Sequence, residues 1–152
     1  MTTRTTLLAL ASRVEAATAA DREMGTRVIA AALAPANAFV EQSKINGAWC
    51  IYTADADGKN RSWQPPRGVR GVDRCPTASL DAAMSLVPSG CLFMVRTLWD
   101  DGKTSGYAVI QHYEPTETQG LRYDGESVAI AATPALALTA ASLRAIAWSM
   151  TE

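Results

Sequence analysis

The sequence predicts an α+β fold, in which a small and mainly antiparallel β-sheet is covered by helices in an α-β-α sandwich-like arrangement. Three observations point to this class. Residues 5–34 carry two helical patterns that predict an N-terminal helical hairpin, residues 47–113 contain β-favouring runs separated by turn sequences, and residues 133–148 form a capped, strongly apolar helical pattern. Because the strands do not alternate with repeated crossover helices, an antiparallel or mixed sheet is expected.

The chain has 152 residues, which fits a single domain spanning residues 1–152. Apolar residues make up 48% and charged residues 19%, as in ordinary globular proteins, and no run approaches the roughly 18 apolar residues of a membrane span. The formal net charge of −1 argues against general nucleic-acid binding by the whole chain.

Cellular location is predicted from the cysteines and the N-terminus. Cys50, Cys75 and Cys91 are widely spaced, without a CxxC motif, which favours reduced thiols over a disulfide framework. Arg13 and Glu15 interrupt the apolar N-terminal stretch that would otherwise resemble a signal peptide. We therefore expect a cytoplasmic protein without a membrane segment.

The first helix is predicted to place one apolar stripe against the core, formed by Leu7, Leu10, Val14 and Ala17, with Arg13 and Glu15 pointing away. A second helix is expected to begin after Asp21, a candidate N-cap, and to end before Pro35.

A short central helix is predicted to follow Thr77, its candidate N-cap, and to stop at Pro88. Its apolar residues recur at helical spacing, which predicts one buried face made of Leu80, Ala83, Met84 and Val87. The C-terminal helix is predicted from Thr133 and Pro134, an N-cap followed by proline at the first helical position, to about Trp148. Most of its circumference is apolar, so we expect it to be buried.

Strands are predicted at residues 48–53, 61–63, 91–99 and 107–113, with turns at residues 55–58 and 100–103. The run at 91–99 is apolar on both faces, which predicts a central strand in a covered sheet. Residues 114–127 are polar and predict an exposed connection with at most a short strand near residues 121–123.

Four segments resemble small phage and prophage proteins of unknown function that are similar to the phage ABA-sandwich domain group. They are residues 77–88 (TASLDAAMSLVP), 132–138 (ATPALAL), 13–18 (RVEAAT) and 21–23 (DRE). The shared residues are mainly caps and core apolar positions, and residues 37–74 and the hairpin that begins at Cys91 show no family pattern. The resemblance implies a phage-encoded accessory protein in the bacterial host cytoplasm with a layered fold, and it implies no catalytic residue.

The strongest candidate binding feature is a cluster of basic residues around one tryptophan, in a chain that is otherwise slightly acidic. Arginine can hold phosphate in a bidentate manner, and an indole can stack on a base. The alternative is a solvated loop whose charges are balanced by neighbouring aspartates. The residues of this predicted anion or nucleotide site are Lys59, Arg61, Trp63, Arg67, Arg70 and Arg74.

Two other site types receive weaker support. Asp55 and Asp57 before Gly58 resemble part of a calcium loop, but the terminal ligands are missing, so a plain β-turn is favoured. His112, the only histidine, could join Cys75 and Cys91 at a zinc ion or serve a cysteine nucleophile as base, but no known spacing supports either. A strand histidine at a sheet edge is favoured, and no metal, cofactor or catalytic residue is expected.

The leading functional hypothesis is a non-enzymatic anti-defence or host-modulating protein, whose basic loop binds a phosphorylated signalling nucleotide or a host immune protein. The alternative is a structural or oligomerising phage interaction module without a small-molecule ligand. An enzyme is the third class, because the acids, the lone histidine and the thiols form no recognisable cluster.

Overall fold

The computed structural model describes residues 2–65, 75–118 and 120–150. Arg67, Arg70 and Arg74 of the predicted basic cluster lie outside these residues. The described part contains four helices and six strands, in an order that begins with two helices and ends with one. They are α1 (Arg4–Ala16), α2 (Arg22–Leu33), β1 (Ala38–Gln42), β2 (Trp49–Ala54), β3 (Asn60–Ser62), α3 (Leu80–Met84), β4 (Leu92–Asp100), β5 (Lys103–Thr116), β6 (Gly120–Ala131) and α4 (Pro134–Ser149).

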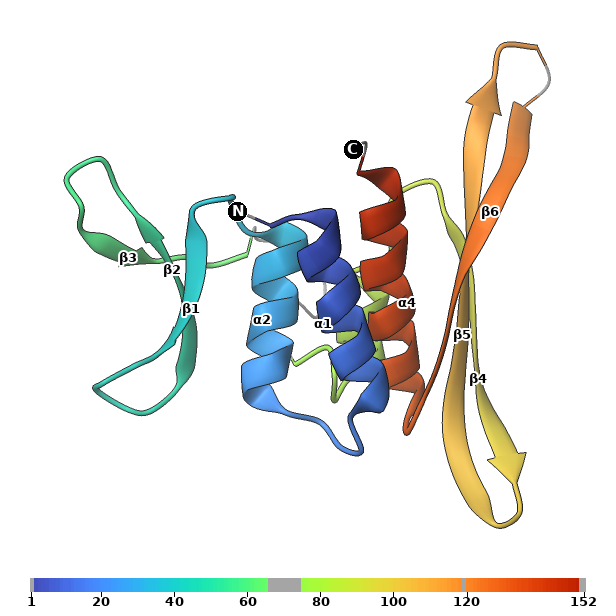
Figure 1. The fold of residues 1–152 in the computed structure, drawn as a ribbon, viewed down its shortest axis with the longest axis horizontal. Coiled ribbons are helices and arrows are strands. Elements are labelled where there is room, and N and C mark those ends of the chain that lie inside the picture. Colours follow the sequence, from blue (N-terminus) through green and yellow to red (C-terminus); the bar gives the residue numbers. More distant parts are fainter. Residues whose placement is uncertain (1, 66–74, 119, 151–152) are drawn as a thin grey trace.

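The predicted α+β class is confirmed, with antiparallel strands, an N-terminal helical hairpin and a buried C-terminal helix. The strands divide into two sheets, with the orders β1-β2-β3 and β4-β5-β6. The helices lie between them: α2 faces the first sheet, α4 faces the second, and α1 packs beside α4 (Figure 1).

Helix α4 forms the centre of the core. Thr133 caps it as predicted, since its side-chain oxygen accepts a hydrogen bond from the Leu136 backbone N–H at 3.2 Å, and Pro134 occupies the first turn. Eleven residues of α4 are buried, among them Leu136, Leu138 and Leu143, which are fully enclosed. The predicted apolar face of α1 packs on the same core through buried Leu7, Leu10, Ala11 and Val14.

Sheet β4–β6 packs closely on α4 because small residues line its inner face. Gly106 of β5 lies opposite Ala131 of β6, and Ala108 of β5 lies opposite Ala129 of β6. At Gly106 a Cβ atom would lie 2.2 Å from the carbonyl oxygen of Thr133, so only glycine fits beside the start of α4.

The central helix differs from its prediction. Helix α3 has only five residues and is capped by Ser79, whose side chain accepts from the Ala82 N–H at 3.4 Å. Thr77 is not the N-cap: it is buried and its hydroxyl donates to the Asp21 carbonyl oxygen at 3.2 Å. Of the predicted buried face, Ala83 is buried and Val87 is partly buried against the core, whereas Leu80 and Met84 are exposed. Ala82 and Leu86, which were not predicted, are buried as well.

The strand predictions need three corrections. Strand β1 was not predicted, because five half-buried or exposed residues give a weak pattern. Residues 120–131, predicted to lie mainly in an exposed connection, form the long strand β6, whose polar outer half pairs with β5 beyond the helices. The expectation of a central, covered strand at 91–99 is wrong: β4 is an edge strand, and most of its residues are exposed.

Candidate binding surfaces

The described part of the predicted basic cluster lies on the β2–β3 hairpin and directly after it. Lys59 and Arg61 are exposed, and the Arg61 guanidinium donates to the Asp55 carboxylate at 2.9 Å. Trp63 is half-buried and anchored through its backbone N–H, which donates to the Ile51 carbonyl oxygen at 2.7 Å. Lys59 and Arg61 are therefore exposed on this hairpin, and the charge of Arg61 is already paired with that of Asp55.

The Asp55 turn has a structural role. The Asp55 carboxylate accepts hydrogen bonds from the backbone N–H groups of Asp57 at 3.1 Å and Lys59 at 2.8 Å. This geometry confirms the predicted β-turn, since an aspartate that bonds the backbone two residues ahead stabilises a turn. No group of three or more His, Cys, Asp or Glu side chains suited to a metal ion occurs in the described ranges.

The lone histidine was predicted to lie at a sheet edge, but it lies on β5, the central strand of its sheet. His112 is buried between the sheet and α4, with its Nε2 atom 3.0 Å from the Ser127 hydroxyl and its ring stacked on Trp148. Cys91 Sγ lies 3.9 Å from His112 Nδ1, so the structure does bring these two residues together. Cys75 is elsewhere, where its thiol contacts the Thr77 hydroxyl at 2.9 Å.

The electrostatics of the Cys91–His112 pair oppose nucleophilic chemistry. Burial lowers the pKa of His112, and the charge of Asp124 only partly opposes this. Burial also raises the pKa of the Cys91 thiol. Because a cysteine nucleophile needs a thiolate beside a cationic or basic partner, a neutral thiol beside a neutral imidazole fits a packing role.

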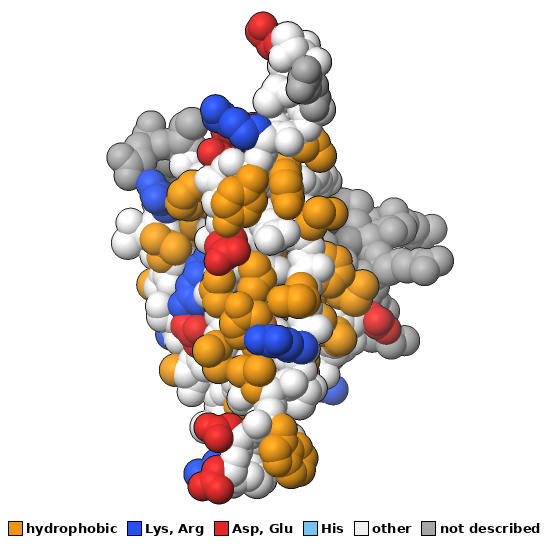
Figure 2. Space-filling view, turned by 90° about the vertical axis from the view of Figure 1, so that its right-hand side faces the viewer, with side chains coloured by type: hydrophobic (Ala, Val, Ile, Leu, Met, Phe, Trp, Pro, Cys, Tyr) orange, Lys and Arg blue, Asp and Glu red, His pale blue; other side chains and the backbone are white. Residues whose placement is uncertain are grey.

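Sheet β4–β6 has an apolar outer face. Since Ala108, Ile110 and His112 point toward α4, the alternate residues of β5 and their partners on β4 and β6 point away from the helices. Figure 2 shows hydrophobic side chains along this face, with isolated charged groups among them. By register the face contains Leu92, Met94, Leu98, Tyr107, Val109, Tyr113, Leu121, Tyr123, Val128 and Ile130.

Several of these side chains are strongly exposed. Leu92 is 61% exposed, Met94 50% and Ile130 53%, whereas Val109 at the middle is 6% exposed because its neighbours on the sheet enclose it. The Arg96 guanidinium lies over the Tyr107 ring, 4.7 Å from its centroid, so the aliphatic stem of Arg96 lies on the face. In the cross-strand rows from Leu92 to Leu98, Arg96 carries the only positive charge, and this contact holds it in place. Contiguous exposed apolar surface of this kind marks interaction sites.

Strand β4 borders this face with an unpaired edge. Among the described residues it pairs only with β5, over nine residues from Leu92↔Gln111 to Asp100↔Lys103. Its sequence LFMVRTLWD holds no proline and a single internal charge. Natural edge strands usually carry charges, bulges or proline that prevent pairing with another chain, and β4 has almost none of these features.

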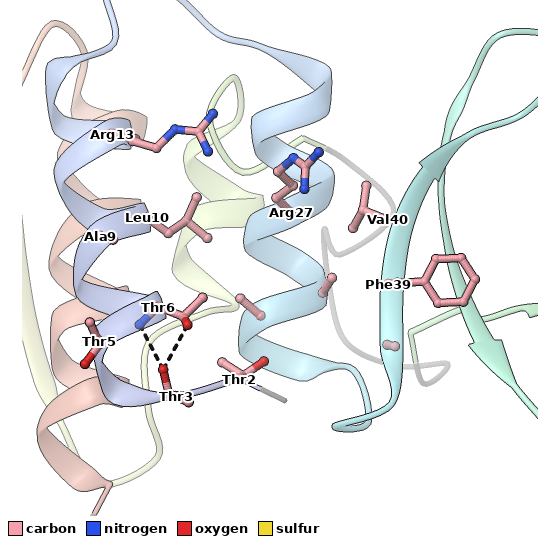
Figure 3. A pocket seen from close by; sticks show the side chains of 13 residues that line it. Thr2, Thr3, Thr5, Thr6, Ala9, Leu10, Arg13, Arg27, Phe39 and Val40 are labelled. Atoms are coloured by element: carbon pink, nitrogen blue, oxygen red, sulfur yellow. Dashed lines mark hydrogen bonds between the residues drawn. The ribbon is translucent and has the colours of Figure 1, made fainter.

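A groove of about 650 Å³ lies on the opposite side of the helices, between α1, α2 and β1. Its walls include Arg13 from α1, Arg27 from α2 and Val40 from β1 (Figure 3). The sequence does not reveal this groove, because β1 was not predicted and Arg13 looked like an ordinary solvent-facing residue. Four of the residues that line the groove are alanines, whose small side chains leave the space open.

No family model, curated protein or solved structure matches the chain. The resemblance to phage proteins therefore stays a prediction. None of the described helices is long and apolar enough to cross a membrane.

Proposed function

We propose that this protein is a non-enzymatic interaction module that assembles with a second copy of itself through strand β4. This corresponds to the oligomerising alternative among the functions predicted from the sequence. The observation that carries the proposal is the nine-residue β4, an exposed edge strand that borders an apolar sheet face.

A second copy fits this edge because β4 is self-complementary in one antiparallel register. A two-fold axis at Val95 places Leu92 opposite Leu98 of the other copy and Met94 opposite Arg96. On the inner side the same register pairs Phe93 with Thr97. No like charges meet, whereas an axis at Arg96 would bring two guanidinium groups together, and like charges directly opposite each other destabilise a sheet.

The proposed pairing would satisfy unpaired backbone groups and enlarge an existing surface. Two three-stranded sheets would join into one of six strands, with both apolar outer faces on the same side. Adding a strand to an exposed edge is a common mode of protein recognition, in which main-chain hydrogen bonds supply affinity and alternating side chains supply specificity.

The phage setting belongs to the proposal only through the sequence resemblance. A phage accessory protein that modulates a host defence protein would need a docking surface, and the joined apolar face would supply one. The nucleotide version of the anti-defence hypothesis has less support, because the guanidinium of Arg61 is already paired with the Asp55 carboxylate.

Two substitutions at one exposed position test the register. Met94→Lys would face Arg96 of the second copy with like charge, whereas Met94→Glu would face it with opposite charge. Both add one charge to the same exposed site of the single chain, so they form a matched pair. We expect the dimer dissociation constant of Met94→Lys to exceed that of Met94→Glu by about tenfold, since two symmetric pairs contribute.

Sedimentation velocity over a range of protein concentrations measures this difference. The proposal expects a reversible dimer for the native chain. A native chain that remains monomeric at all concentrations would contradict it, and equal dissociation constants for the two variants would contradict the register centred on Val95.

A further inference from the structure

The groove between α1, α2 and β1 is polar at both ends and apolar between them. At one end lie the side chains of Arg13 and Arg27, and at the other lie the N-terminal threonines (Figure 3). The middle is formed by small or branched apolar residues. These are Ala9, Leu10, Ala30, Ala31, Ala38 and Val40.

The hollow exists because the facing positions lack large side chains. Leu10 of α1 points toward α2 (Figure 3), but Ala30 and Ala31 of α2 contribute only small side chains to the groove, so the space between the two helices is not filled. The Phe39 ring turns away from the helices and stacks on Tyr52, with ring centroids 5.8 Å apart, whereas Val40 points toward the helices (Figure 3). The volume of the groove, about 650 Å³, is within the range of small-molecule sites.

The charge in the groove is positive. Among the described residues, its lining contains two arginines and no carboxylate. Arg27 is held in place by Glu23, one turn earlier on α2, at 2.8 Å and by the ring of Trp49 at 6.0 Å. Arg13 is exposed and forms no ion pair among the described residues, so its guanidinium is available to an incoming anion.

The threonine end is already partly organised. The Thr3 hydroxyl accepts a hydrogen bond from the Thr6 N–H at 3.1 Å and lies 2.9 Å from the Thr6 hydroxyl (Figure 3). This N-cap fixes the first turn of α1, which forms that end of the groove. Thr2 and Thr5 complete the hydroxyl-rich end.

We propose that this groove binds a small organic anion, with its apolar body against the alanines and Val40 and its phosphate or carboxylate head at Arg13 and Arg27. A guanidinium fork binds either head group through charge-assisted hydrogen bonds. The alanine-lined middle favours a compact apolar body, and the absence of a carboxylate from the lining removes repulsion. This site is separate from β4 and does not depend on the proposed dimer.

Titration by two-dimensional NMR with three small probes tests the site and its head-group preference. Phenyl phosphate and benzoate carry the two anionic heads on similar bodies, and benzyl alcohol is the neutral counterpart. We expect an anionic probe to shift the amide signals of Ala30, Ala31 and Val40 in a saturable manner, with benzyl alcohol producing much weaker shifts. A stronger response to phenyl phosphate or to benzoate identifies the head group.

Three substitutions and one control make the test specific. Arg13→Gln should weaken binding of the anionic probe by about fivefold, the effect of one exposed charge-assisted contact. Ala30→Leu should abolish it by filling the groove. Glu23→Gln should strengthen it by releasing Arg27 from its ion pair. Arg122→Gln removes the same charge from a distant exposed arginine paired with Glu114 and should leave binding unchanged.

Two outcomes would overturn the proposal. One is that neither phenyl phosphate nor benzoate produces saturable shifts of the amide signals of Ala30, Ala31 and Val40. The other is equal weakening by Arg13→Gln and Arg122→Gln, which would indicate attraction to net charge alone. Neither Arg13 nor Arg122 lies on β4, so the groove and the dimer are tested independently. A chain that is monomeric and still binds the probe would contradict the proposed dimer and support the groove.

Discussion

The two sheets of this protein are built from strands of different length and are held by different contacts. Sheet β4–β6 has strands of 9 to 14 residues and packs on α4, the most buried helix, through glycine and alanine. Sheet β1–β3 has strands of 3 to 6 residues, and its clearest core contact is the buried Ile51 on β2. Its outer hairpin is polar and is stabilised by the Asp55 turn.

This difference shows where exposed apolar surface has a functional meaning. On the face turned away from the helices, the short sheet carries one aromatic pair, Phe39 stacked on Tyr52, and its outer hairpin is polar, as expected for an edge that avoids association. The long sheet is apolar on the face turned away from the helices, although it has a well-packed inner face of its own. The outer residues are therefore not needed to fill the core, and an interface accounts for them better.

The largest expected effect comes from the glycines of the two sheets. Gly106→Ala should destabilise the fold by about 3 kcal/mol or more, because its Cβ would meet the Thr133 backbone at 2.2 Å. Gly58→Ala in the β2–β3 turn should cost only about 1 kcal/mol, because no atom lies near the added Cβ and only the positive φ of 73° is unfavourable. Chemical denaturation measures both. Equal losses would contradict the different packing of the two sheets.

A smaller effect concerns pH and the buried His112. Its pKa is lowered in the folded chain by burial, so the unfolded chain binds more protons below the ordinary value of 6.5. The free energy of unfolding should therefore fall as pH decreases from about 6.5 through the lower folded pKa. His112→Gln should remove this slope.

Glu15 titrates in a separate window and serves as an internal comparison. Its hydrogen bond from Arg144 lowers the pKa of its carboxyl below the ordinary 4.5, against the opposing effect of burial. Its stabilising contribution is present above that value and is lost as pH falls through the folded pKa. Denaturation curves from pH 7 to pH 3 separate the two groups. A His112→Gln variant with an unchanged slope between pH 6.5 and 5 would contradict the role of His112.

The smallest expected effect lies in the short sheet. Asp55→Ala should cost about 1 kcal/mol, because the carboxylate bonds two backbone N–H groups of the turn. Arg61→Ala should leave stability within measurement error, since its ion pair is solvent-exposed. Thermal denaturation compares the two variants, and a larger loss for Arg61→Ala would show that this hairpin depends on its charges.

Local signals in the sequence predicted α1, α2 and α4 well, and the short helix α3 and the sheets less well. Thr133 with Pro134, and Asp21 before α2, are caps that act within one turn, and the structure places both as predicted. Apart from the short strand expected near residues 121–123, strand β6 was missed because its partners on β5 lie across the hairpin, and polar composition suggested a loop. Strand β1 was missed because its pairing with β2 gives no local signal.

The candidate surfaces were hidden for a related reason. The strand at 91–99 was predicted to be apolar on both faces, but composition does not distinguish a face covered within the chain from one left for a partner. Arg13 was correctly expected to face away from the core, yet the groove beside it depends on β1, 25 residues further along the chain. Both surfaces arise from the arrangement of distant elements, which local periodicity does not contain.

Hydrogen exchange of the β4 amides tests the central claim most directly. Measured by NMR residue by residue in dilute and concentrated protein, alternate amides of Leu92–Asp100 should become protected on concentration, because those N–H groups point to the free edge. The amides of β1, an edge strand of the other sheet, should not change. Protection that is independent of concentration at β4, or that rises equally at β1, would contradict assembly through β4.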